Sequence, residues 1–118
     1  MVATKAFVDK NPDAVARFVK ASLEGWRSYL RNPAPGNALI KADNPKMSGD
    51  QIAFAVEQLK ALKVLDGGDA ATLGIGIMTE ARWKATYDFA VATGLLKPEV
   101  DWRVGYTDRF VKGLKLSM

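Results

Sequence analysis

Apolar residues recur every three or four positions in residues 11–32, and most charged residues of that stretch fall between them. This spacing is typical of an amphipathic helix with one broad apolar face. Asn11 is a favourable N-cap and Pro12 suits the first turn, whereas Pro33 and Pro35 predict the end of the helix. The apolar face is expected to comprise Val15, Phe18, Val19, Ser22, Leu23, Trp26, Tyr29 and Leu30.

The same period predicts three further helical segments. A short one follows in residues 36–45, and a longer one in residues 48–65 opens with Ser48 and Gln51, which have the spacing of a capping box. The last segment, residues 79–96, is followed by a tail whose aromatic residues suggest packing across the helices. The pattern therefore predicts a mainly α fold.

Glycines dominate the link between the last two predicted helices, and Gly74 and Gly76 form a Gly-x-Gly just before a helix start. A dinucleotide fingerprint needs a third glycine where this chain has Thr79, and a P-loop needs Gly-Lys followed by Ser or Thr. Both fingerprints fail. The segment is interpreted as an extended turn, with Thr79 as the next N-cap and Gly94 as the left-handed residue that closes that helix.

Composition and charge narrow the possible functions. With 118 residues, 48% hydrophobic and 25% charged, the chain has the balance of one globular domain. Without cysteine or histidine it lacks thiolate and imidazole ligands and the commonest general base, so neither a metal nor a cofactor is expected. The net charge of +4 is scattered, which indicates a solvated surface rather than a nucleic-acid groove. Neither a signal peptide nor a membrane span is recognisable.

Candidate chemistry is sparse. Asp66 and Asp69 flank a pair of glycines, but two loop carboxylates are too few for a dedicated calcium site and are interpreted as turn residues. Arg17 and Arg82 are the nearest candidates for anion contacts, although an ordinary surface role is the simpler interpretation. No pair of acids and no nucleophile with a base stands out, so an enzyme is not predicted.

Three stretches together resemble one protein family: NPDAVARFVKASLEGW (11–26), ALIKADNPKMSGDQIAFAVEQLK (38–60) and VLDGGDAATLGIGIMTEARWKATYDFAVATGLL (64–96). In order and spacing they resemble the C-terminal part of the solute-binding proteins of ABC importers. The proteins concerned deliver thiamine pyrimidine precursors, nitrate, sulfonates or taurine. The resemblance extends from Val2 to Phe110, nearly the whole chain.

The resemblance implies a two-lobed (type II) periplasmic binding protein that is α/β when intact. Residues 1–118 would form a single helical fragment, the C-terminal part of lobe 1, and residues 2–4 would be the remnant of a strand leading into a turn over residues 4–10. The implied role is to capture a small polar or anionic organic solute in the periplasm or cell envelope and to pass it to an ABC permease. Most pocket residues of the family lie outside these residues, so the ligand-binding residues stay unassigned.

Helices that cover a sheet in the implied parent must bury their apolar faces elsewhere when that sheet is absent. The predicted partner is the missing N-terminal part of the parent or a second copy of the chain, so self-association or a loosely packed monomer is expected. Burial of each large apolar side chain contributes roughly 1.5–3 kcal/mol. The interaction face is predicted to comprise Val15, Phe18, Val19, Trp26 and Leu30.

The alternative from another class is a stand-alone helical module for protein or DNA interaction. A helix-turn-helix can be drawn around residues 44–48, with Gln51, Gln58 and Lys60 on the recognition helix. Asp50 in the first turn of that helix would repel phosphate, which weakens this interpretation.

Overall fold

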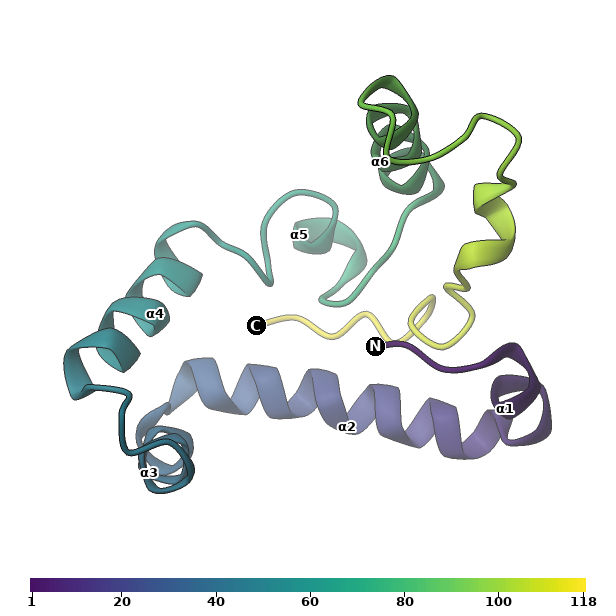
Figure 1. The fold of residues 1–118 in the computed structure, drawn as a ribbon. Helices are drawn as coiled ribbons and strands as arrows, with labels where there is room; N and C mark the ends of the chain where they lie inside the picture. Colours follow the sequence, from purple (N-terminus) through teal and green to yellow (C-terminus); the bar gives the residue numbers. More distant parts are fainter.

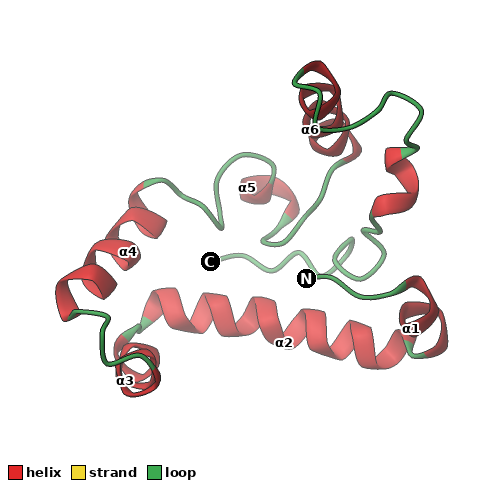
Figure 2. Cartoon of the chain, in the orientation of Figure 1, coloured by secondary structure: helices red, strands yellow, loops and turns green.

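Helices joined by turns and irregular segments make up the chain, and no strand is present, as Figure 2 shows by the absence of yellow. The computed structural model describes all 118 residues. The predicted mainly α fold is confirmed. No helix is both long enough and apolar enough to span a bilayer. In chain order the elements are α1 (Lys5–Lys10), α2 (Pro12–Arg31), α3 (Ala34–Asp43), α4 (Gly49–Ala61), α5 (Ala70–Leu73), α6 (Glu80–Ala92) and the 3₁₀ helix η1 (Trp102–Gly105).

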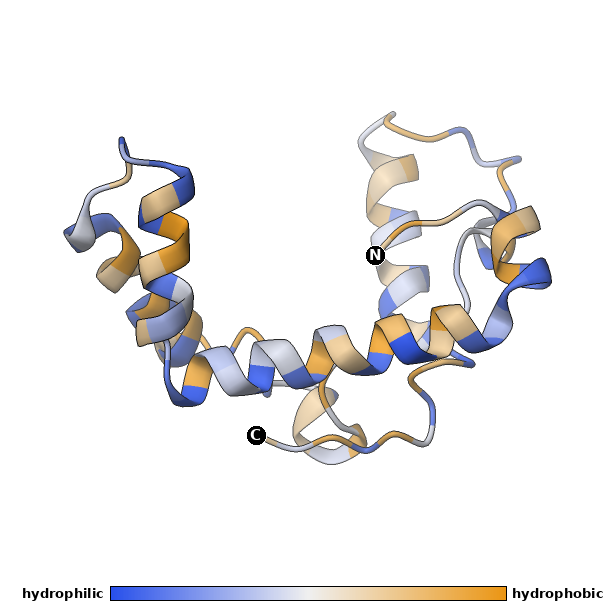
Figure 3. Cartoon of the chain, turned by 90° about the horizontal axis from the view of Figure 1, so that it is seen from below, coloured by the Kyte–Doolittle hydropathy of each residue, from blue (hydrophilic) through white to orange (hydrophobic).

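The longest helix, α2, forms the base of the molecule, with α1 at its N-terminal end and α3 and α4 at its C-terminal end (Figure 1). The helices α6 and η1 lie together on the side of α1. The C-terminal tail returns to the middle of the molecule, where the Ile75 N–H donates a 2.8 Å hydrogen bond to the Leu116 carbonyl. Seen from below, apolar segments recur along α2 and α4 (Figure 3).

The predicted helix ends are confirmed where side chains cap them. Ser48 accepts a 3.1 Å hydrogen bond from the Gln51 N–H, and the Gln51 side chain accepts a 2.9 Å bond from the Ser48 N–H. Thr79 accepts from the N–H of Arg82 at the start of α6. Gly94 has a φ of 73°, the left-handed conformation expected after a helix. These ends were predictable because each cap involves residues no more than four positions apart.

Pro33 and Pro35 were both predicted to stop α2, but Pro35 instead lies within the next helix, α3. They do end α2, but α3 begins at Ala34 and includes Pro35 in its first turn. A proline is tolerated there because the first N–H groups of a helix have no intrahelical partner. At the other end of this region, α4 ends at Ala61, earlier than predicted, and Lys63 adopts a left-handed φ of 49°.

Two segments expected to be irregular or extended are helical. Residues 2–4 form no strand, and the predicted turn after them is α1, whose Thr4 side chain accepts a 3.2 Å bond from the Phe7 N–H. A lone strand has no partner for its backbone groups, whereas a capped helix satisfies them within the segment. In the glycine-rich link, the sequence AATL forms the single turn α5, since alanine is the strongest helix former.

The core is small and the molecule is open. Only 9 of the 118 residues are buried, and the main cluster joins α2 to the glycine-rich link and the tail. The radius of gyration is 16.9 Å, against roughly 13.5 Å for a compact domain of this length. The accessible surface is 8768 Å², about 2,500 Å² more than a compact monomer of this mass exposes. The core cluster comprises Val19, Leu23, Ile75 and Val111.

The Gly-x-Gly segment places Ile75 in this core, where only 3% of that residue is exposed. Gly74 has a φ of 98°, and a Cβ there would lie 2.8 Å from the Cα of Lys115. Gly76 has a φ of 83°, and a Cβ there would lie 2.6 Å from a methyl group of Leu23. The two glycines therefore let the tail and α2 approach Ile75 from either side, and the segment is a turn, as predicted.

Candidate functional site

The apolar face of α2 is divided between two environments. Val19 and Leu30 are buried, with 8% and 5% of each residue exposed, whereas Phe18 and Trp26 are exposed by 64% and 47%. Val15 is half-buried against the core cluster. Of the five residues predicted to form an interaction face, Val19 and Leu30 thus belong to packing within the chain. Phe18 and Trp26 are the two large side chains that this face offers to solvent.

An open groove of about 470 Å³ lies beside this exposed face, between α2, α3 and α4. The Trp26 and Tyr29 rings meet edge to face, with centroids 6.1 Å apart. The Tyr29 hydroxyl donates a 2.7 Å hydrogen bond to the Asn37 side-chain oxygen, which fixes the ring against α3. No charged side chain lines the groove, so it suits an apolar or aromatic group. The lining residues are Ser22, Gly25, Trp26, Tyr29, Ile40 and Leu59.

Sequence reasoning missed Gly25, Ile40 and Leu59 as groove residues. Gly25 carried the one available signal, because a glycine in a helix interior costs roughly 0.5–1 kcal/mol relative to alanine. Ile40 and Leu59 lie on separate helices, and only the placement of α3 and α4 beside α2 brings them together.

A second, polar pocket of about 270 Å³ lies between the start of α6, η1 and the turn that follows. Its Arg103 side chain lies 4.0 Å from Glu80 and 4.0 Å from Asp101, and its guanidinium covers the Trp102 ring at 4.6 Å from the centroid. All of these charged groups are largely exposed, so their ion pairs contribute little. The pocket lining comprises Glu80, Arg103, Tyr106, Thr107 and Asp108.

Four aromatic rings form a ladder that holds α6 against η1. Trp83 stacks on Tyr106 with centroids 4.9 Å apart, and Tyr106 in turn lies 6.1 Å from Trp102. Tyr87 extends the ladder at 6.3 Å from Trp102, and its hydroxyl donates a 2.6 Å hydrogen bond to the Pro98 carbonyl. The rings pack on one another, as the sequence suggested for the tail, so the ladder is a structural element.

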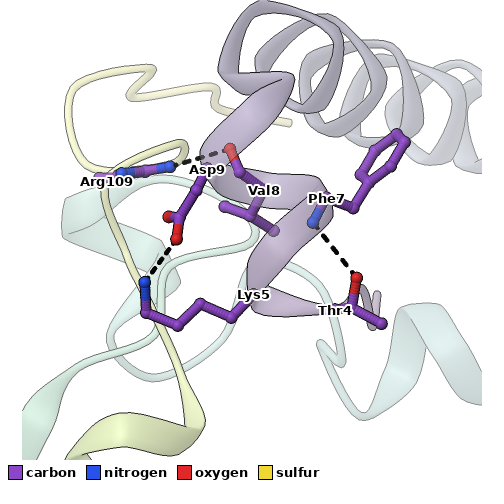
Figure 4. Close-up of polar contacts among 6 residues, drawn as sticks. All are labelled: Thr4, Lys5, Phe7, Val8, Asp9 and Arg109. Atoms are coloured by element: carbon purple, nitrogen blue, oxygen red, sulfur yellow. Dashed lines mark hydrogen bonds and ion pairs between the residues drawn. The ribbon is translucent and has the colours of Figure 1, made fainter.

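The tail also contacts the N-terminal helix, as Figure 4 shows. The Arg109 guanidinium donates a 3.3 Å hydrogen bond to the Val8 carbonyl and lies 4.5 Å from the centroid of the Phe110 ring. On the same helix Lys5 pairs with Asp9 one turn later. These groups are exposed and do not converge on a cavity, so the contact joins the two ends of the chain without forming a binding site.

The remaining candidates do not assemble into a chemical site. Asp69 accepts a 2.7 Å hydrogen bond from the Thr79 hydroxyl and so ties the glycine-rich link to α6. Arg17 and Arg82 are exposed and line neither of the two cavities. No three His, Cys, Asp or Glu side chains are placed to hold a metal ion. The structure therefore leaves the ligand-binding residues unassigned.

Two comparisons with known proteins match the chain. A family model described as NMT1/THI5-like matches residues 1–35, which contain α1 and α2. The riboflavin-binding protein RibY of Chloroflexus aurantiacus is 30% identical over 111 residues, which cover 93% of this chain and 32% of that protein. The chain thus spans about a third of the length of the curated relative that it matches. No solved structure matches it.

These similarities point to a class of binding proteins rather than to a class of enzymes. More particularly, the chain is similar to the NMT1/THI5-like family over residues 1–35 and to a riboflavin-binding protein over 111 residues, which confirms the resemblance that the sequence motifs indicated.

Proposed function

We propose that the chain is a helical part of one lobe of a two-lobed solute-binding protein that serves an ABC importer. In this role it acts without catalysis: the intact protein captures a small solute in the periplasm or cell envelope and passes it to the permease. The observation that carries the proposal is the 30% identity to a riboflavin-binding protein over 93% of this chain.

The openness of the structure supports this role. About 2,500 Å² of surface beyond that of a compact monomer is exposed, including large apolar residues on α2, α4 and α6. Surfaces of this size and character are normally covered by other polypeptide. A lobe in which these helices pack on further structure provides that cover.

The proposed solute is a small polar or anionic organic molecule of the class that the resemblance implies. Riboflavin joins this class because one relative carries the name of a riboflavin-binding protein. Such a solute would be enclosed between the lobes, where a few polar groups in a largely pre-formed cleft determine specificity.

The proposal is tested with a chimera in which the matching third of the Chloroflexus riboflavin-binding protein is replaced by this chain. We expect a cooperatively unfolding chimera that quenches riboflavin fluorescence or binds another solute of the class in calorimetry. The same chimera with Val19→Asp is the control for folding, because it places a charge in the core cluster. A chimera that unfolds cooperatively but binds no solute of the panel, or one no more stable than the Val19→Asp control, contradicts the proposal.

A further inference from the structure

We propose that residues 114–118 form a releasable strap across the small core, and that the strap pivots at Gly113 while the rest of the molecule stays folded. The strap belongs to the yellow end of the chain in Figure 1. In the closed form, which this structure shows, it covers one side of the core cluster. In the open form it exposes Ile75 and the core side of α2. The inference does not depend on the transport role.

The strap buries every second side chain. Its three apolar side chains are half-buried against the core cluster, and the two polar side chains between them are exposed. Alternation of this kind places one row of side chains on a surface and the other row in water, as in a β-strand. The strap therefore lies across the core without being enclosed by it. The inward residues are Leu114, Leu116 and Met118, and the outward residues are Lys115 and Ser117.

Few interactions hold the strap closed. One backbone hydrogen bond joins it to the segment after α5, from the Ile75 N–H to the Leu116 carbonyl at 2.8 Å. A second bond, from the Leu114 N–H to the Val111 carbonyl at 3.0 Å, is local to the turn before the strap. None of the inward side chains is fully buried. Opening therefore breaks one long-range hydrogen bond and uncovers three half-buried side chains, and the other contacts of the molecule remain.

Backbone strain at Lys115 weakens the closed form. Lys115 has a left-handed φ of 42°, a conformation that is unfavourable for a residue with a Cβ. The strain occurs where the strap comes closest to the glycine-rich link, because a Cβ at Gly74 would lie 2.8 Å from the Lys115 Cα. Such strain persists only while surrounding contacts maintain it. Opening relieves it, so the strap is held less tightly than its contacts alone would allow.

A hinge and an anchor lie directly before the strap. Gly113 has a φ of 122°, and a Cβ added there would meet no atom within 4 Å. Backbone freedom, not space, is therefore what glycine provides here, and hinges are often residues of this kind. On the near side of the hinge Val111 is buried in the core cluster, and Arg109 donates a 3.3 Å hydrogen bond to the Val8 carbonyl. The chain is thus fixed up to Val111 and can turn at Gly113.

Native-state hydrogen exchange of the full chain, followed by NMR, tests whether the strap opens separately. The Ile75 amide reports on the strap, because its bond partner is Leu116, and the Leu23 amide reports on unfolding of α2. After correction for intrinsic rates, we expect Ile75 to exchange at least about tenfold faster than Leu23. Its exchange should also depend less on urea, because opening exposes less surface than unfolding.

Three substitutions separate opening of the strap from unfolding of the whole chain. Leu116→Ala should speed exchange at Ile75 at least about fivefold, because it removes part of an inward side chain. Ser117→Ala is the matched control on the outward row and should change that rate less than about twofold. Ser48→Ala removes the cap of α4 and should also leave the rate within about twofold, because α4 is folded in both the closed and the open form.

Substitution of Lys115 tests the strain. Lys115→Gly should slow exchange at Ile75 about threefold, since glycine adopts the left-handed conformation without a steric cost that outweighs its greater freedom in the open form. Lys115→Ala keeps the strain and is the matched control. It should leave the exchange rate within about twofold of that of the unsubstituted chain.

Four results would overturn the proposal. Equal exchange at Ile75 and Leu23, with the same dependence on urea, shows that the strap opens only when the chain unfolds. An Ile75 amide without protection shows that the strap is not closed in solution. Equal effects of Leu116→Ala and Ser117→Ala show that the inward row does not hold the strap. Equal rates for Lys115→Gly and Lys115→Ala contradict a strained closed form.

Discussion

Replacing Gly74 with alanine should lower the free energy of unfolding by about 2–4 kcal/mol, because it strains the backbone at this position and breaks a backbone hydrogen bond. Gly74 has φ 98° and ψ 156°, a region that side-chain-bearing residues essentially never occupy. Holding alanine there costs of order 1–3 kcal/mol. The new Cβ would also lie 2.8 Å from the Cα of Lys115, so the tail must move away.

Movement of the tail also breaks a hydrogen bond, which lowers the free energy of unfolding further. The Ile75 N–H donates a 2.8 Å bond to the Leu116 carbonyl, and such a bond contributes about 0.5–1.5 kcal/mol. Gly68→Ala is the matched control, because Gly68 has a positive φ of 56° but a Cβ added there would meet no atom within 4 Å. In that variant the free energy of unfolding falls only by the cost of holding alanine in the left-handed region, about 1–2 kcal/mol.

Urea unfolding followed by far-UV circular dichroism measures both variants. All samples need one fixed protein concentration, since association would shift the apparent stability. We expect Gly74→Ala to unfold at lower urea than Gly68→Ala, with about 1 kcal/mol between them, the contribution of the lost tail hydrogen bond. Equal losses for the two variants would refute the idea that close approach of the tail is what requires glycine at this position.

Three further predictions concern local interactions. Ser48→Ala should cost about 1 kcal/mol of stability in urea unfolding, because it removes one half of the capping box with Gln51; an unchanged midpoint would contradict the cap's role. Tyr87→Phe should cost about 0.5–1.5 kcal/mol by loss of the hydroxyl bond to the Pro98 carbonyl, and tryptophan fluorescence should report a loosened ladder, whereas a wild-type melt and spectrum would argue against it. Lys84→Ala should change stability by less than about 0.5 kcal/mol in thermal melts, since its ion pair on α6 is exposed; a larger loss would indicate a buried role.

The candidate site was only partly predictable. The period of α2 located its apolar residues, including Phe18 and Trp26, because a helical period depends on nothing outside the helix. It could not divide them into a buried and an exposed set. That division depends on where Ile75 and the returning tail pack, and the groove needs Ile40 and Leu59 from two other helices.

The sequence by itself determined the helices α2, α3, α4 and α6, and those of their ends that local caps define. The capping residues Ser48 and Thr79 and the closing residue Gly94 act within a few positions along the chain, so local chemistry was sufficient. It also carried the family resemblance, since the motifs are read directly from residue order.

The tertiary structure alone decided what the glycine-rich link does and which side of α2 remains open. Gly74 and Gly76 are required by contacts with Lys115 and Leu23, residues that lie 41 and 53 positions away along the chain. Contacts between residues so distant in sequence depend on how the whole chain packs, and no local pattern encodes them. The same packing covers only one face of α2, the face with Val19 and Leu23 that joins the small core. The face with Phe18 and Trp26 stays exposed.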